Sequence, residues 1–247
     1  MNEKEFASMF GQQESSVSAQ ERNDAVTGMA FGVLMRKVYT WMTLALAITA
    51  GAAYYVAHSD LIFTIANNPA IMWGLIIGEL VLVIALSAAI NKLSLSVATI
   101  MFVIYSLVNG VTLSFIFLVY DIGTIGTVFL ITAATFGAMA LIGYTTKKDL
   151  SGMGRFLLMA LIGIIIATVV NLLFVKSAGF DLLLSYAGVL IFAGLTAYDT
   201  QKIKEMCNSF DYADASAQKL ALLGALSLYL DFINLFLYLL RLLGGRD

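Results

Sequence analysis

Seven apolar stretches divide the sequence, and each is long enough to cross a lipid bilayer as a helix. The hydrocarbon core of a bilayer is about 30 Å thick, so about 20 helical residues cross it. Because 60% of the residues are hydrophobic and only 12% are charged, the chain cannot cover a soluble core with polar surface. The sequence therefore predicts an all-α membrane protein with seven transmembrane helices. We expect them at residues 38–57, 70–90, 94–119, 123–144, 156–175, 182–201 and 219–241.

The lysines and arginines predict the orientation of the chain. Loops on the side of the N-terminus hold eleven basic residues, whereas the alternate loops hold only Lys176. Basic residues are retained in cytoplasmic loops, so we expect a cytoplasmic N-terminus. A full crossing by residues 219–241 places Arg241 and Arg246 outside, against this rule. We expect the full crossing because the stretch is long enough, and a half-span that turns back is the alternative.

The segments outside the spans contain few residues that indicate a chemical function. Residues 1–35 are polar and rich in Gln, Ser and Glu, and they lack the layout of a cleaved signal peptide. We expect a flexible cytoplasmic tail there and a transmembrane domain over residues 36–247. Cys207 is the single cysteine and His58 the single histidine, so neither a disulfide nor a cofactor is expected. No basic stripe with interleaved aromatic residues suggests nucleic acid binding.

Three acidic residues, Glu79, Asp199 and Asp231, fall inside the spans. A carboxylate at bilayer depth costs roughly 2.5–3.5 kcal/mol on insertion scales. No lysine or arginine lies in the interior of any span to neutralise these three. They must share protons, hold a cation, face water or reach a basic group at a helix end. Because intramembrane carboxylates of this kind are usually functional, Asp199 and Asp231 are the candidates for a pH sensor and gate.

Two carboxylates that approach each other titrate as one coupled unit. Singly protonated, Asp199 and Asp231 close as a hydrogen bond; doubly ionised, they repel each other. Carboxylate oxygens also suit a hard cation such as Ca²⁺, so the two aspartates are a candidate for a weak Ca²⁺ site. In the structural alternative, each aspartate is protonated and bonds a backbone carbonyl or a basic group at the cytoplasmic rim.

Other polar residues group with these acids by helical spacing. Ser227, Asp231 and Asn234 share one face of the last span, and Arg241 lies further along that helix. These neighbours are candidates for an ion pathway or for a latch that holds the gate. Glu79 stands alone in its span and is either a second pathway carboxylate or an interfacial residue.

Three segments resemble the Bax inhibitor family, also called the transmembrane Bax inhibitor motif proteins. AYDTQKIKEM and ALSLYLDFINLFLYLLRLLGG are similar to the family's C-terminal pair of helices. MRKVYTWMTLALAITAGAA resembles the first span of the bacterial members, and the GEL of the second span resembles an acidic site of the family. The resemblance covers roughly residues 30–245.

The resemblance implies a seven-helix fold whose last helix is wrapped by the other six. It also implies a pH-sensitive calcium leak that depends on two aspartates, whose positions Asp199 and Asp231 match, in a bacterial cell (inner) membrane. Family members can carry an arginine near the cytoplasmic end of the second span that pairs with an aspartate. Here the segment reads AINKLS, so Asn91 or Lys92 must substitute as the latch.

Three classes of function compete at this point. The first is a leak channel for calcium or other cations, gated by the aspartate pair, with Ca²⁺ and protons as its ligands. The second, which the family also implies, is an interaction protein that modulates a membrane-anchored ATP-dependent protease or another membrane partner without transport. An enzyme is not expected. Asp199 and Asp231 on successive helices would suit a two-aspartate intramembrane protease, but SLYLDFINLF lacks the glycine-rich motif such enzymes need.

Overall fold

The structure is a computed structural model that describes residues 32–90, 92–207 and 215–245, and long helices make up most of this part of the chain. Seven of these helices are long and apolar enough to cross a membrane, so the predicted number of spans is confirmed. The first helix covers Gly32–Ala57. It is followed by α2 (Leu61–Ala66), α3 (Pro69–Ala89), α4 (Leu95–Leu113), α5 (Ile122–Thr145), α6 (Ser151–Val170), α7 (Ala178–Cys207) and α8 (Ala215–Leu243). A 3₁₀ turn, Ser114–Leu118, extends α4, and a π-helical turn, Asn171–Val175, extends α6.

Short polar side chains begin three of the helices. Asn68 precedes Pro69 and its Oδ1 accepts a hydrogen bond from Ala70 N, at 3.2 Å. Ser94 Oγ accepts from Val97 N at 3.3 Å at the start of α4. Asp121 Oδ1 accepts from Thr124 N at 2.9 Å at the start of α5, and its Oδ2 accepts from the Thr124 hydroxyl. The hydrogen bond from the Thr124 hydroxyl is the main cause that lowers the pKa of exposed Asp121 below its ordinary value. Hydrogen bonds from backbone N–H groups lower it further.

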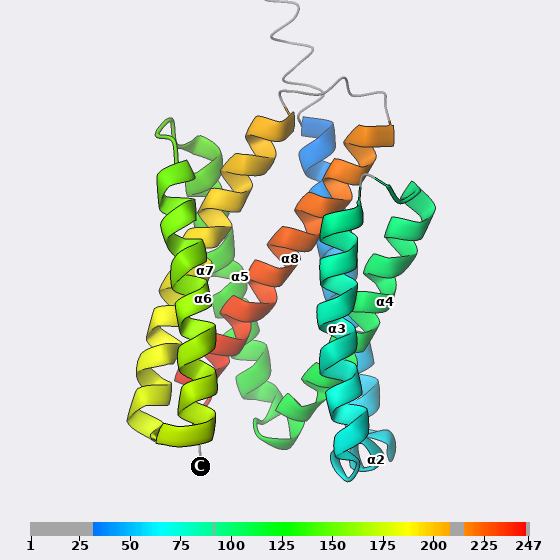
Figure 1. Cartoon of the computed structure of the whole chain (residues 1–247), viewed down its shortest axis with the longest axis vertical. Helices are drawn as coiled ribbons and strands as arrows, with labels where there is room; N and C mark the ends of the chain where they lie inside the picture. Colours follow the sequence, from blue (N-terminus) through cyan, green and yellow to red (C-terminus); the bar gives the residue numbers. More distant parts are fainter. Residues whose placement is uncertain (1–31, 91, 208–214, 246–247) are drawn as a thin grey trace, which may run out of the picture.

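The helices are longer than the apolar stretches because they continue into the polar zone at both membrane faces. The predicted tail lies outside the described residues except for residues 32–35, which begin the first helix. α8 has 29 residues and no break, which corresponds to a length of about 43 Å. In Figure 1 it runs from one end of the bundle to the other. α8 is therefore a full crossing, and the half-span alternative is wrong.

α8 is the centre of the bundle. In its most apolar window 67% of the residues are buried inside the protein, against 6% in α3 and 11% in α6. α8 packs most extensively against α7 and also contacts α5 and α4. The first helix reaches it through Thr49, whose hydroxyl lies 2.7 Å from that of Tyr229. The expected arrangement, with the last helix inside and the others around it, is confirmed, and α3 and α6 are the outermost helices (Figure 1).

Close contacts hold the C-terminal half of α7 in place. A side chain at Gly143 of α5 would put its Cβ 2.1 Å from Ala197 O, so glycine lets α5 touch the backbone of α7. On the α6 side, Gly154 makes room for the Tyr198 ring. Gln201 accepts a bond from Leu150 N and donates one to Lys148 O, both at 2.8 Å. These contacts flank Asp199 and fix where its side chain emerges.

Candidate functional site

Asp231 lies near the middle of α8 and is 5% exposed. Its Oδ2 atom is buried and has no hydrogen-bond partner among the described residues. Leaving a buried polar atom unpaired costs about 1–3 kcal/mol, and native structures contain few such atoms. Its sequence neighbours Leu230 and Phe232 are apolar, so they offer no side-chain donor. The polar chemistry around this carboxylate is incomplete within the described part of the chain.

Asp199 approaches Asp231 from the antiparallel neighbour α7. The Phe192 ring stacks on Tyr238 with centroids 5.8 Å apart, and Ile203 packs against Gly224. These contacts lie on either side of Asp199 along α7 and on either side of Asp231 along α8. The two carboxylates are close enough to interact electrostatically. The structure thus brings the two aspartates together, from successive helices of the chain.

One cation near Asp199 comes from its own helix. Lys202, one turn further along α7, interacts electrostatically with Asp199, and its Nζ lies 5.9 Å from the centre of the Tyr198 ring. Lys92, a predicted latch, is exposed and makes no ion pair with another described residue. Asn91, the other predicted latch, lies outside the described residues.

The remaining residues predicted on the face of Asp231 have different surroundings. Asn234 Nδ2 donates to Leu230 O of its own helix at 2.8 Å. Ser227 is half-buried. Arg241 is ten residues beyond Asp231, about 15 Å along the helix axis, and its Nη1 lies 3.5 Å from Asp181 Oδ1. Arg241 therefore lies at the C-terminal end of α8, where its ion pair is with Asp181 and not with Asp231.

Glu79 belongs to a second polar site, which we call the Glu79 cluster: Glu79, Thr112, Asn109, Tyr229 and Thr49. Thr112 Oγ1 donates to Glu79 Oε1 at 2.6 Å, and Asn109 Nδ2 donates to Glu79 Oε2 at 3.5 Å. The Tyr229 hydroxyl donates to Asn109 Oδ1 at 2.9 Å and lies 2.7 Å from the Thr49 hydroxyl. Because Glu79 is at the midpoint of α3, the interfacial position considered from the sequence is not the one it occupies.

Tyr229 and Thr49 are members of this cluster that the sequence did not single out. Tyr229 is fully buried, and the rings of Phe102 and Tyr105 contact it edge-on with centroids 5.9 Å away. A buried tyrosine usually finds a hydrogen-bond partner, which is the signal that could have identified it. It was missed because it lies two residues before Asp231 and so points to a different face of α8.

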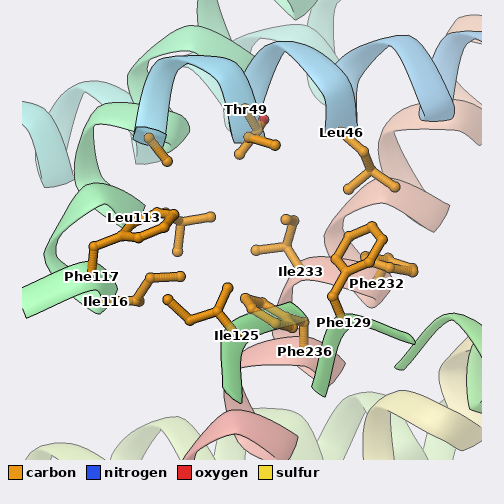
Figure 2. A pocket seen from close by; sticks show the side chains of 12 residues that line it. Leu46, Thr49, Leu113, Ile116, Phe117, Ile125, Phe129, Phe232, Ile233 and Phe236 are labelled. Carbon is orange, nitrogen blue, oxygen red and sulfur yellow. The ribbon is translucent and has the colours of Figure 1, made fainter. Parts of the chain in front are cut away.

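An apolar pocket of about 90 Å³ lies beside the Glu79 cluster, between the first helix, α4, α5 and α8 (Figure 2). Thr49 is the only polar side chain in its lining, which includes Leu113, Phe117, Phe129, Phe232 and Phe236. A bound water needs two to four polar partners, and this lining does not supply them. The pocket is therefore a dry space that adjoins α8 just beyond Asp231, towards the C-terminal end of that helix.

The oxygen atoms of the aspartate pair suit a hard cation but do not complete a shell. Ca²⁺ takes six to eight oxygen ligands in proteins. Among the described residues, no group of three or more His, Cys, Asp and Glu side chains is placed to hold a metal ion. Asp199 and Asp231 can thus supply part of a coordination shell, with the rest left to water or backbone oxygens. This chemistry fits transient contact with a passing cation.

Comparison with known proteins agrees with this architecture. The family model described as "Inhibitor of apoptosis-promoting Bax1" matches residues 32–247. The inner membrane protein YbhL of Escherichia coli (strain K12) is 50% identical over 232 residues, which cover 91% of this chain and 97% of that relative. A protein of Borreliella burgdorferi is 46% identical over 213 residues, covering 86% of this chain and 91% of its own length. A membrane protein of Streptococcus pyogenes serotype M1 is 40% identical over 214 residues, covering 85% and 92%. The chain is a multi-pass integral membrane protein, and it belongs to the Bax inhibitor family.

Proposed function

We propose that this protein is a pH-sensitive calcium leak channel of a bacterial inner membrane, gated by Asp199 and Asp231. The observation that carries the proposal is the buried, unpaired Oδ2 atom of Asp231 beside the carboxylate of Asp199. A protein that needed Asp231 only for stability would supply that atom with a donor. The location is supported by the name of the Escherichia coli relative, an inner membrane protein.

The gate is the protonation state of the pair. With one proton between them, the carboxylates form a hydrogen bond that joins α7 to α8. With both ionised, the like charges repel and favour a different register of the two helices. A change in pH then shifts the populations of two helix arrangements, which is the ordinary way in which titration switches a packed element. Lys202, on the same helix, is a cation that interacts electrostatically with Asp199.

The barrier in this proposal is the dry apolar pocket. A cation that leaves the aspartates towards the outer side along α8 meets Phe232 and Phe236, and the Phe129 ring packs edge-on against both (Figure 2). Apolar constrictions block ions because water does not fill them. A shift of α8 that follows a change in protonation moves two walls of this barrier at once. In the closed state of this proposal, the apolar lining of the pocket is intact.

The test is calcium flux from liposomes that contain the purified protein. The unchanged protein should leak Ca²⁺ with a pH dependence, and Asp231→Asn and Asp199→Asn should flatten that dependence. Asp60→Asn is the matched control, because Asp60 is an exposed carboxylate that makes no side-chain cap bond at the start of α2. Unchanged flux and unchanged pH dependence in Asp231→Asn would overturn the proposal.

The same experiment separates the competing function, a membrane interaction protein that modulates a membrane-anchored protease or another partner. That function requires no flux from liposomes at any pH. It also requires a stoichiometric partner that is captured from native membranes and retained by Asp231→Asn. Flux that depends on the aspartates favours the channel.

A further inference from the structure

Two basic residues break the orientation rule, and they line the same pocket. Lys176 and Arg241 are at the outer end of the bundle, whereas the rule retains basic residues on the cytoplasmic side. The pocket has a volume of about 640 Å³, and residues from the end of α6, the turn after it, the start of α7 and the end of α8 line it. Two basic residues on the side that the rule disfavours, both lining one pocket, are not explained by the topology of the chain.

The backbone holds Lys176 in an unusual conformation at the rim. Its φ of 49° lies in the left-handed region, where a residue other than glycine is strained. Asn171 fixes this turn, because its Oδ1 accepts from Ser177 N at 3.1 Å and its carbonyl accepts from Lys176 N at 2.7 Å. Strain of this kind clusters at ligand-binding sites. The Lys176 side chain is exposed and has no hydrogen bond or ion pair with another described residue.

Arg241 is only partly neutralised. One long contact joins its Nη1 to Asp181 Oδ1 at 3.5 Å, and the two side chains are 36% and 23% exposed. The guanidinium also lies 5.6 Å from the centre of the Tyr238 ring. Because a guanidinium has five N–H donors, most of them stay available to a ligand. With Lys176 and Arg241 against Asp181, the pocket carries one net positive charge.

We propose that this pocket binds the phosphate group of an anionic phospholipid from the outer leaflet. The planar guanidinium of Arg241 matches two phosphate oxygens, and Lys176 adds a second positive charge. Leu172 also lines the pocket and is 71% exposed. Leu173 and Phe174 continue this apolar surface, with 59% and 77% of each exposed. A lipid uses both the charged pocket and the apolar surface, whereas free phosphate uses only the charges.

A pocket at the other end of the bundle provides a matched comparison. It also holds two lysines, Lys147 and Lys204, but it includes Asp149 and Glu205 and has a volume of about 180 Å³. The two acids balance the two lysines, and Lys204 Nζ already donates to Tyr144 O at 2.8 Å. Removing two lysines there changes the net charge of the protein by the same amount as removing Lys176 and Arg241.

The test is phosphatidylglycerol binding to the delipidated full-length protein in neutral detergent, followed by native mass spectrometry. Lys176→Gln with Arg241→Gln should weaken the tightest binding about tenfold. Lys147→Gln with Lys204→Gln should leave it unchanged. Equal weakening in both double variants, or none in the first, would overturn the proposal. Lys176→Gln alone should also weaken binding, and since the Lys176 side chain has no partner among the described residues, this variant tests the site at little cost to folding.

Two further arms identify the source of the phosphate group. Inorganic phosphate at the molar concentration of the lipid should not displace phosphatidylglycerol, and phosphatidylcholine should bind more weakly because its headgroup is neutral overall. Displacement by inorganic phosphate would assign the pocket to a soluble anion instead of a lipid. Equal binding of phosphatidylcholine would remove the role of net charge. No arm measures calcium flux, so the proposal stands or fails independently of the leak.

Discussion

The two intramembrane acidic sites differ in how the protein compensates for burying a carboxylate. In the Glu79 cluster, both carboxylate oxygens have donors, Thr112 and Asn109, and the bonds continue through Tyr229 to the first helix. At the second site, Asp231 Oδ2 has no donor within the described residues, and its charged neighbour is another acid. A satisfied carboxylate joins helices, whereas an unsatisfied pair depends on protons or cations. This difference agrees with the proposed gating role of the aspartates, and we propose that Glu79 anchors its helix.

The largest expected contrast is in stability. Glu79→Ala removes the acceptor of the Thr112 and Asn109 hydrogen bonds, although the Thr112 hydroxyl keeps Val108 O as an acceptor at 3.3 Å. The variant should lower the free energy of unfolding by about 1–3 kcal/mol. Asp231→Ala removes an unpaired buried atom and a like-charge contact, so it should cost little or increase stability. Thermal unfolding of both variants in the same detergent measures the difference. Equal losses would contradict the division of roles.

Gly143→Ala breaks the aspartate site without touching the Glu79 cluster. The added Cβ meets Ala197 O, so α7 must move at a point two residues from Asp199. We expect a loss of about 1–3 kcal/mol, typical of overpacking, and a changed pH dependence of calcium flux. Gly137→Ala is the matched control. Gly137 lies on the same helix, and a Cβ there would meet nothing within 4 Å. If the two variants behave alike, the α5–α7 contact does not position Asp199.

Tyr229→Phe tests the Glu79 cluster instead of the aspartate site. It removes the hydroxyl that bonds Asn109 and approaches Thr49, and it should lower the free energy of unfolding by about 1 kcal/mol. Tyr105→Phe is the control, because the Tyr105 hydroxyl has no hydrogen bond to another described residue although its ring contacts the same core. The pH dependence of flux should survive Tyr229→Phe, and its loss would mean that the two sites are one.

The features that could be predicted from the sequence are those that depend on hydrophobicity or on an isolated charge. The seven spans follow from apolar length, and Asp199 and Asp231 are visible as charges without counter-charges. It failed where the result depends on which helices meet. Tyr229 and Thr49 are uncharged, and their contact joins the first and last helices. Arg241 was grouped with Asp231 because helical spacing defines a face but ignores depth, and ten residues are about 15 Å.

The smallest expected effect concerns Asp121, a carboxylate outside the membrane spans. Bonds from Thr124 keep the pKa of Asp121 below its ordinary value of about 3.9. The stability that this cap contributes is therefore present above that ordinary value and is lost as the pH falls through the lowered one. The difference in melting temperature between the unchanged protein and Asp121→Ala should shrink below about pH 4. Ser94→Ala removes an uncharged cap at the start of α4, so its difference should not change over the same pH range. Parallel pH profiles for the two variants would show that the charge of Asp121 adds nothing to its hydrogen bonds.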